Sequence, residues 1–188
     1  LGDVIIMKSV SLGSLGFFKL RTIDIAVLGI LMALELIINR FMVTTQFIQI
    51  SFGFVIVAIA SYLYGPVWSS IIAAITDILG TLISGSVYFP GFTLSAILGA
   101  FIYGLFFFNH KVTVQRIFLA QLIITLFVDV ILNTLWLTVM YKTPFFGILP
   151  ARILKEVIVT PIQMLIIYLA FRLDAKQFAL IKNRLSLS

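Results

Sequence analysis

YFPGFTLSAILGAFIYG, residues 88–104, decides the fold of this chain. A rigid Phe-Pro-Gly turn enters a helix on which the small residues Ala96, Ala100 and Gly104 recur at every fourth position. This spacing places them on one helical face, where two helix backbones can approach closely inside a membrane. The turn itself is aromatic and uncharged, so we expect it at the membrane edge, where a solute can be held.

The composition predicts an integral membrane protein. Of 188 residues, 62% are hydrophobic and only 11% are charged, which is too little polar surface for a soluble domain of this size. The chain has no cysteine, and its one histidine, His110, lies beside Lys111 in a predicted loop. We therefore expect no disulfide, no metal centre, no cofactor and no histidine-based catalytic relay.

The net charge of +6 is spread in a way that argues against nucleic acid as a partner. Lysine and arginine gather at the ends of predicted helices and in the C-terminal tail, where they determine membrane topology. No basic face with interleaved aromatic residues accompanies them.

Six apolar runs approach the roughly 20 residues that a helix needs to cross a membrane. They span residues 23–41, 48–64, 67–84, 92–108, 117–140 and 153–173. The sequence thus predicts an all-α membrane protein with six transmembrane helices in a compact bundle. We expect a single membrane domain over residues 1–188, with an N-terminal cytoplasmic segment, 1–20, and a cytoplasmic tail, 174–188.

The positive charges predict the orientation of this bundle. With both termini on one side, nine lysines and arginines lie there and four lie on the other side, so both termini are expected in the cytoplasm. The nine are Lys8, Lys19, Arg21, Lys111, Arg116, Arg172, Lys176, Lys182 and Arg184; the four are Arg40, Lys142, Arg152 and Lys155.

The outer basic residues Arg40, Arg152 and Lys155 allow three interpretations. Their charged tips can snorkel to the lipid headgroups. They can instead form an outward-facing anion site, since guanidinium groups bind carboxylates through two parallel hydrogen bonds. Arg152 can also pair with Glu156, four residues along the same helix. Because the three cations converge from the outer ends of two spans, we favour the anion site.

Asn133, with Trp136 close to it on the fifth span, adds a second clue. A buried amide can join helices, or it can bind one edge of a heterocycle. The aromatic residues at the outer side form either an interfacial belt or an aromatic box; they are Tyr88, Phe89, Phe92, Trp136, Phe145 and Phe146. Together with the outer cations, this set suits a flat aromatic solute that carries carboxylates.

Glu35, Asp77 and Asp129 are carboxylates inside predicted spans. They can relay protons, or each can be satisfied by a neighbour such as Thr76. Finding no basic residue at their depth, we expect the second, structural role. On the first span, Gly29 and Ala33 form a small-xxx-small step that serves either packing within the bundle or docking of a partner helix.

Several segments, in order along the chain, resemble the substrate-binding S component of energy-coupling factor (ECF) vitamin transporters, specifically the folate-type group. They are LGILMALELIINRF at 28–41, TDILG at 76–80, YFPGFTLSAILGAFIYGLFF at 88–107, LNTLWL at 132–137 and PARILKEVIVTPIQ at 150–163. The resemblance implies a six-helix protein that captures a vitamin outside the cell and topples in the bilayer to deliver it. It also implies a transmembrane coupling subunit and two ATPase subunits as partners, and the sequence has no GxxxxGK[ST] phosphate loop of its own.

By position, the resemblance assigns Gly29 and Ala33 to the coupling-subunit interface. It assigns Arg40, Asn133 and Arg152 to the vitamin site, beside the turn at Tyr88 and Phe89. We add Trp136 and Lys155 to this site on chemical grounds.

Folate is the expected vitamin, because its pterin can stack between aromatic rings and its glutamate tail suits Arg40, Arg152 and Lys155. Pantothenate, with one carboxylate and no ring, is the alternative within the family. A proton-coupled secondary transporter is less favoured. An intramembrane enzyme is also less favoured, since no base accompanies the hydroxyls of Ser86 and Ser95.

Overall fold

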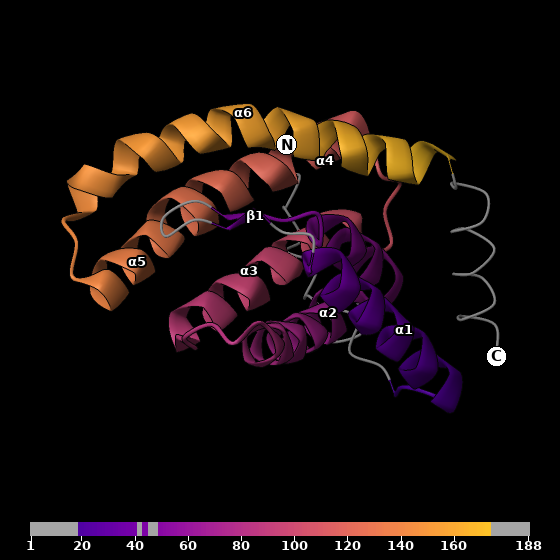
Figure 1. Cartoon of the computed structure of the whole chain (residues 1–188). Coiled ribbons are helices and arrows are strands. Elements are labelled where there is room, and N and C mark those ends of the chain that lie inside the picture. The colour runs from indigo at the N-terminus through magenta and orange to yellow at the C-terminus, as the bar shows by residue number, and fades with distance from the viewer. Residues whose placement is uncertain (1–18, 41–42, 45–48, 174–188) are drawn as a thin grey trace, which may run out of the picture.

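A computed structural model describes residues 19–40, 43–44 and 49–173 as helices joined by short connections and one small β-ribbon (Figure 1). The elements are α1 (Thr22–Asn39), β1 (Val43–Thr44), β2 (Gln49–Ile50), α2 (Phe54–Ser84), α3 (Pro90–Phe107), α4 (Val114–Ile123), the π-helix η2 (Ile124–Leu132), α5 (Asn133–Tyr141) and α6 (Phe145–Leu173). The predicted all-α membrane bundle is confirmed at this level. The predicted tail and all but two residues of the N-terminal segment lie outside the described residues, and so do Lys8, Lys176, Lys182 and Arg184.

Five helical stretches in the described part of the chain are long and apolar enough to cross a membrane, where the sequence predicts six. The difference arises at residues 48–84, because the second and third predicted helices follow each other without a loop and form α2. Gly65 interrupts α2 with a non-helical backbone, φ 79° and ψ 177°, which only glycine adopts readily. Pro66 follows it and supplies no backbone N–H.

The chain turns sharply at Gly65, between the two halves of α2. The hydroxyls of Ser61 and Ser69 lie 3.1 Å and 3.4 Å from the same atom, the carbonyl oxygen of Ala100. In a straight helix, eight residues would separate these serines by about 12 Å. Because both reach one oxygen, the chain must turn sharply between them.

The small residues of α3 pack against this turn. The sequence predicts such a close approach of two helix backbones here. Ala100 is completely buried, and a Cβ atom added at Gly104 would lie 2.3 Å from Cα of Pro66. The hydroxyl of Ser70 donates to the carbonyl oxygen of Ile97 at 3.1 Å and so continues the contact along α3. Small residues at positions 100 and 104 thus allow α2 and α3 to pack backbone against backbone.

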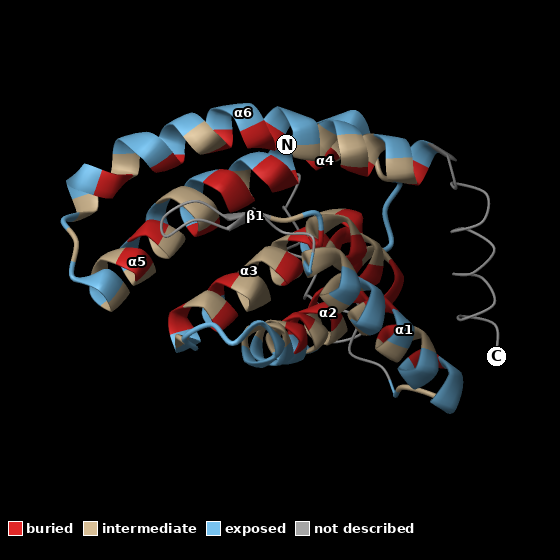
Figure 2. Ribbon diagram, in the orientation of Figure 1, coloured by how far each residue is buried: buried red, intermediate tan, exposed pale blue. Residues whose placement is uncertain are grey.

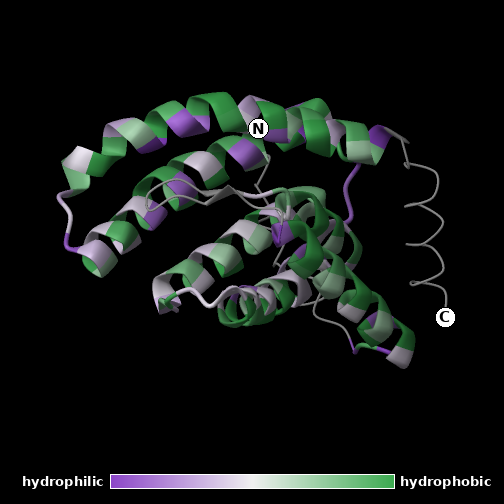
Figure 3. Ribbon diagram, in the orientation of Figure 1, coloured by the Kyte–Doolittle hydropathy of each residue, from purple (hydrophilic) through white to green (hydrophobic). Residues whose placement is uncertain are grey.

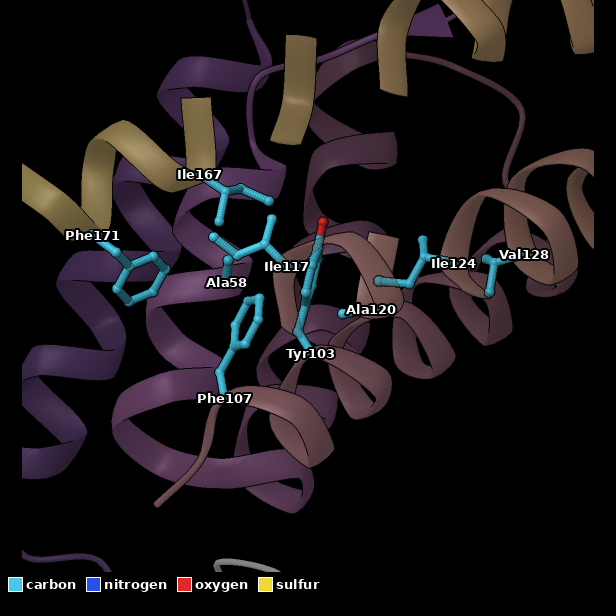
Figure 4. Packing of buried hydrophobic residues seen from close by; sticks show 9 residues of the cluster. All are labelled: Ala58, Tyr103, Phe107, Ile117, Ala120, Ile124, Val128, Ile167 and Phe171. Atoms are coloured by element: carbon cyan, nitrogen blue, oxygen red, sulfur yellow. The ribbon is translucent and has the colours of Figure 1, made fainter. Parts of the chain in front are cut away.

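The core lies where α2, α3, α4 and α6 meet (Figure 4). Its centre is the buried cluster of Ala58, Tyr103, Phe107, Ile117, Ala120, Ile124, Val128, Ile167 and Phe171. The outward faces stay largely apolar although they are exposed (Figures 2 and 3). This inversion of the soluble pattern is what a lipid environment permits.

Segments that carry several of the predicted site residues lie at one end of the bundle. α6 lies along the rod formed by α4, η2 and α5, and α3 packs against η2 and α5 (Figure 1). The start of α3 and the connection between α5 and α6 therefore lie at the same end, opposite the connection between α3 and α4. The β-ribbon pairs Val43 with Ile50 and Thr44 with Gln49, and the hydroxyl of Ser51 closes its base by donating to Asn39 Oδ1.

Candidate functional site

The turn that precedes α3 is fixed at both ends. Gly85 ends α2 in the left-handed conformation, φ 68°. Its N–H donates to the backbone carbonyl oxygens of Leu82 and Thr81. Phe89 is extended and Pro90 occupies the first turn of α3, where a missing N–H is harmless. The hydroxyl of Thr93 donates to Asp77 Oδ2 at 2.7 Å and lies 3.1 Å from the Tyr88 hydroxyl, so Tyr88 is tied to α2 while its ring stays 43% exposed.

Behind this turn, Phe89 and Trp136 form an aromatic wall between α3 and α5. Their ring centroids are 6.0 Å apart at 46°, and Phe92 meets Phe89 edge-on at 6.0 Å. Trp136 donates its indole N–H to Ser95 Oγ at 3.1 Å. A Cβ at Gly91 would come within 2.5 Å of the indole, so this glycine makes room for it. Three of the predicted aromatic residues thus come together.

Phe145 and Phe146 behave differently. They meet each other edge-on at 5.5 Å, and Phe146 is 81% exposed at the start of α6. This is the arrangement of an interfacial belt, in which aromatic rings lie among the lipid headgroups.

A polar cluster lies next to the aromatic wall, where η2 and α5 face α6. Asn133 Nδ2 donates to Asp129 Oδ1 at 3.2 Å, and Arg152 Nη2 donates to the backbone carbonyl oxygen of Asp129 at 2.8 Å. Lys155 forms an ion pair with Glu156 Oε1. Arg152 is 5% exposed and Glu156 3%, so both groups are held away from bulk water and lipid. We call Asp129, Asn133, Arg152, Lys155 and Glu156 the polar cluster.

The π-helix explains how Arg152 finds its acceptor. The N–H of Asn133 bonds to the carbonyl of Val128, five residues back, at the end of η2. When the hydrogen-bond pattern returns from five to four residues in α5, a carbonyl near this transition loses its partner within the helix. The Arg152 guanidinium donates to the carbonyl of Asp129, which lies in this stretch.

The expectation that no basic residue lies at the depth of the membrane carboxylates is wrong for Asp129. Both Arg152 and Lys155 are close enough to attract its carboxylate, and Glu156 is close enough to repel it. Glu156 forms an ion pair with its neighbour Lys155. Sequence reasoning therefore missed Asp129 and Glu156 as members of the site, although Asp129 lies four residues before Asn133.

Glu35 and Asp77 fit the structural role expected for them. Asp77 accepts the hydrogen bond from Thr93, and Glu35 hydrogen-bonds Thr76 and faces Asp77. No group of three or more histidine, aspartate or glutamate residues able to hold a metal occurs in the part of the chain that the structure describes.

The remaining predicted residues lie on α1, apart from the aromatic wall. Arg40 is exposed at the C-terminal end of α1. Ala33 is exposed, and a Cβ added at Gly29 would meet no other atom within 4 Å. Leu28 and Leu31 pack α1 onto α2 from the other face. The small-residue face of α1 is therefore uncovered within the described bundle, and its role as a partner interface stays a prediction.

Comparison with known proteins adds independent information. Residues 24–172 match the model of the family described as ECF transporter, substrate-specific component. A folate transporter FolT of Clostridium novyi is 40% identical over 148 residues, which cover 78% of this chain and 86% of the relative. A second folate transporter FolT, of Leuconostoc mesenteroides, is 38% identical and covers 81% of this chain and 86% of the relative. A crystal structure of FolT bound with folic acid superposes with a TM-score of 0.77 at 38% identity, over 80% of this chain and 93% of that one.

Proposed function

This chain is a substrate-specific component of the ECF transporter family, and on that premise we propose that it captures folate at the outer face of the membrane. It is a membrane transport protein and not an enzyme. Folate is supported by the two relatives that carry the name folate transporter and by the solved structure of one with folic acid.

The observation that carries the proposal is the aromatic wall beside the polar cluster. A pterin is flat, so it can stack on Phe89 and Trp136, which are already in contact. Asn133 lies one helical turn before Trp136 and can bind the edge of the same ring. Tyr88, held by Thr93 at the mouth of this wall, would cover the ring from the outside.

The glutamate tail of folate requires positive charge nearer the water. Arg40, exposed at the end of α1, is the outermost cation of the proposed site. Arg152 and Lys155 lie farther in, on α6, where they bond to the Asp129 carbonyl oxygen and to Glu156. The seven proposed binding residues are Arg40, Tyr88, Phe89, Asn133, Trp136, Arg152 and Lys155.

The fold supports a topology of six crossings. The break at Gly65 divides α2 into two helices, which we count as separate crossings, so that the five apolar stretches give six crossings. An even number puts both termini on one side, and the excess of lysine and arginine there places them in the cytoplasm. We propose the bacterial cell membrane as the location.

A substrate-binding component needs a source of energy that this sequence does not supply. We propose that it works with a transmembrane coupling subunit and two ATPase subunits, docked on the uncovered face of α1 at Gly29 and Ala33. Small residues let helix backbones approach closely in a membrane, as Gly104 does within the bundle.

The test is equilibrium binding of folic acid and pantothenate to the purified protein. We expect folate to bind far more tightly, and equal or reversed affinities would overturn the proposal. Arg40→Ala should weaken folic acid by about tenfold to a hundredfold, because a charge-assisted hydrogen bond is lost. A pterin without the glutamate tail should lose far less. Uptake of folate by the chain without any coupling subunit would favour a secondary transporter instead.

The partner interface is tested separately. Gly29→Leu should leave the Kd for folic acid unchanged and abolish uptake in cells that express the coupling and ATPase subunits. Ile30→Leu on the exposed surface of the same helix is the matched control and should preserve uptake. Equal uptake by both variants would exclude this face as the interface.

A further inference from the structure

We propose that the carboxylate of Asp129, together with the amide oxygen of Asn133, binds the hydrogen-bond donors on the pyrimidinone edge of the pterin. Arg152 acts as a positioning residue, since it holds the backbone of Asp129. The inference rests on the proposed function and specifies how one end of the ligand is bound.

The first observation is an acceptor that lacks a donor. Asn133 uses its Nδ2 group on Asp129, which leaves Asn133 Oδ1 buried and without a hydrogen bond among the residues described. Buried amide oxygens are nearly always bonded, so this atom calls for a donor. On the neighbouring carboxylate, Oδ1 accepts the hydrogen bond from Asn133.

The second observation is the charge balance of the polar cluster. Two acidic side chains, Asp129 and Glu156, face two basic ones, Arg152 and Lys155. A ligand carboxylate placed against Asp129 would upset this balance inside the membrane, where unpaired charge is costly. A neutral group that offers donors would not. The polar cluster therefore suits the ring of the ligand better than its acidic tail.

The third observation is the position of Asp129 relative to the aromatic wall. Asp129, Asn133 and Trp136 follow one another at spacings of four and three residues, and the hydrogen bond between the first two places them on one face. On that face, the Trp136 ring contacts Phe89 and so forms part of the aromatic wall. A ring that stacks on the wall thus points one edge at these acceptors. The pterin edge has two adjacent donors, a ring N–H and an exocyclic amino group, and a carboxylate binds such a pair side by side.

The experiment compares folic acid with 2-desamino folic acid, which lacks the exocyclic amino group, by equilibrium binding. The wild-type protein should bind the analogue about tenfold to a hundredfold more weakly, because a hydrogen bond to a charged group is lost. Asp129→Asn should weaken folic acid by a similar factor and bring the ratio of the two affinities close to one. Glu35→Gln, a carboxylate-to-amide change on α1, is the matched control and should keep the wild-type ratio.

Each outcome decides one question. Failure of the wild-type protein to bind folic acid would refute the proposed function itself. Tight binding of folic acid with an equal affinity for the analogue would refute only the role of Asp129. An equal loss for both ligands in Asp129→Asn would show a counter-ion with no contact to the ring and would also refute it. If that variant does not fold, Asp129→Glu keeps the charge balance and moves the acceptors, so an unchanged ratio there overturns the inference.

Discussion

The α2–α3 hairpin and the α5–α6 region differ in whether their buried side-chain polar atoms have hydrogen-bond partners. In the hairpin, the hydroxyls of Ser61, Ser69 and Ser70 all donate to backbone carbonyls of α2 or α3. On α5, several buried side-chain atoms have no hydrogen-bond partner within the described structure. These atoms are Asn133 Oδ1, Thr134 Oγ1 and Thr138 Oγ1.

We interpret this difference as one between the scaffold and the proposed site. Lipid offers no hydrogen bonds, so polar atoms inside a membrane protein must find partners within the protein or in a ligand. The serine hydroxyls of the hairpin are satisfied on folding, and its stability should not depend on folate. On α5, an amide oxygen and two hydroxyls have no hydrogen-bond partner in the described structure, as we expect for groups that bind a polar ligand. Four experiments test this distinction.

Arg152→Ala should have the largest effect. Arg152 is buried beside Asp129 and Glu156, and its removal leaves excess negative charge in the polar cluster. We expect the free energy of unfolding to fall by about 3–5 kcal/mol, as for other broken buried charge clusters. Binding of folic acid and of a pterin without the tail should fall by similar factors, because Arg152 holds the backbone of Asp129. Thermal unfolding and equilibrium binding measure both quantities.

The control for this change is Arg152→Lys, which keeps the charge but cannot reproduce the planar guanidinium. It should recover most of the stability and only part of the affinity. If alanine and lysine at this position behave alike in both measurements, the charge balance of the polar cluster is not what holds α6 against η2.

Gly104→Ala should break the scaffold side of the comparison. Its Cβ would lie 2.3 Å from Cα of Pro66, which is backbone and cannot move aside. We expect a loss of about 1–3 kcal/mol in the free energy of unfolding, with or without folate. Gly99→Ala, on the same helix, meets no atom within 4 Å and should be neutral. Equal melting temperatures for the two variants would show that the hairpin is not closely packed at Gly104.

Much of the scaffold could be predicted from the sequence because its signals are local. The spacing of Ala100 and Gly104 predicts a close contact with another helix, and α2 makes this contact. The predicted spans 48–64 and 67–84 are separated only by Gly65 and Pro66, and the structure has a tight break at this point of α2. A break of one residue looks the same in sequence whether the chain bends slightly or folds back.

The polar cluster was harder to predict because it depends on contacts between distant segments. Arg152 is 23 residues from Asp129 in sequence, and their contact depends on the π-helix at residues 124–132. Nothing in ITLFVDVIL marks a widened helix, since its residues also suit an α-helix. The sequence predicts Asn133 and Trp136 as site residues because an amide and an indole at membrane depth are unusual. It predicts only a structural role for Asp129, because no cation lies near it in the sequence.

Phe89→Leu tests the site with a smaller change. It keeps an apolar side chain but removes the ring that contacts Trp136. An aromatic pair contributes about 0.5–1.5 kcal/mol beyond its buried area, so folic acid should bind roughly twofold to tenfold more weakly. Phe146→Leu, at an exposed ring on α6, is the control and should leave the Kd unchanged. The same loss in both variants would place the ligand elsewhere.

The smallest expected effect tests the comparison most directly. Ser61→Ala removes a hydroxyl bonded across the hairpin, and the free energy of unfolding should fall by about 0.6 kcal/mol, the average for such bonds in membranes. Thr134→Val removes a hydroxyl that is fully buried and has no partner in the described bundle, so the ligand-free protein should be as stable as the wild type or more so. Melting temperatures without folate measure both changes. If Thr134→Val destabilises the ligand-free protein as much as Ser61→Ala, the α5 hydroxyls are satisfied before folate arrives, and the two regions do not differ.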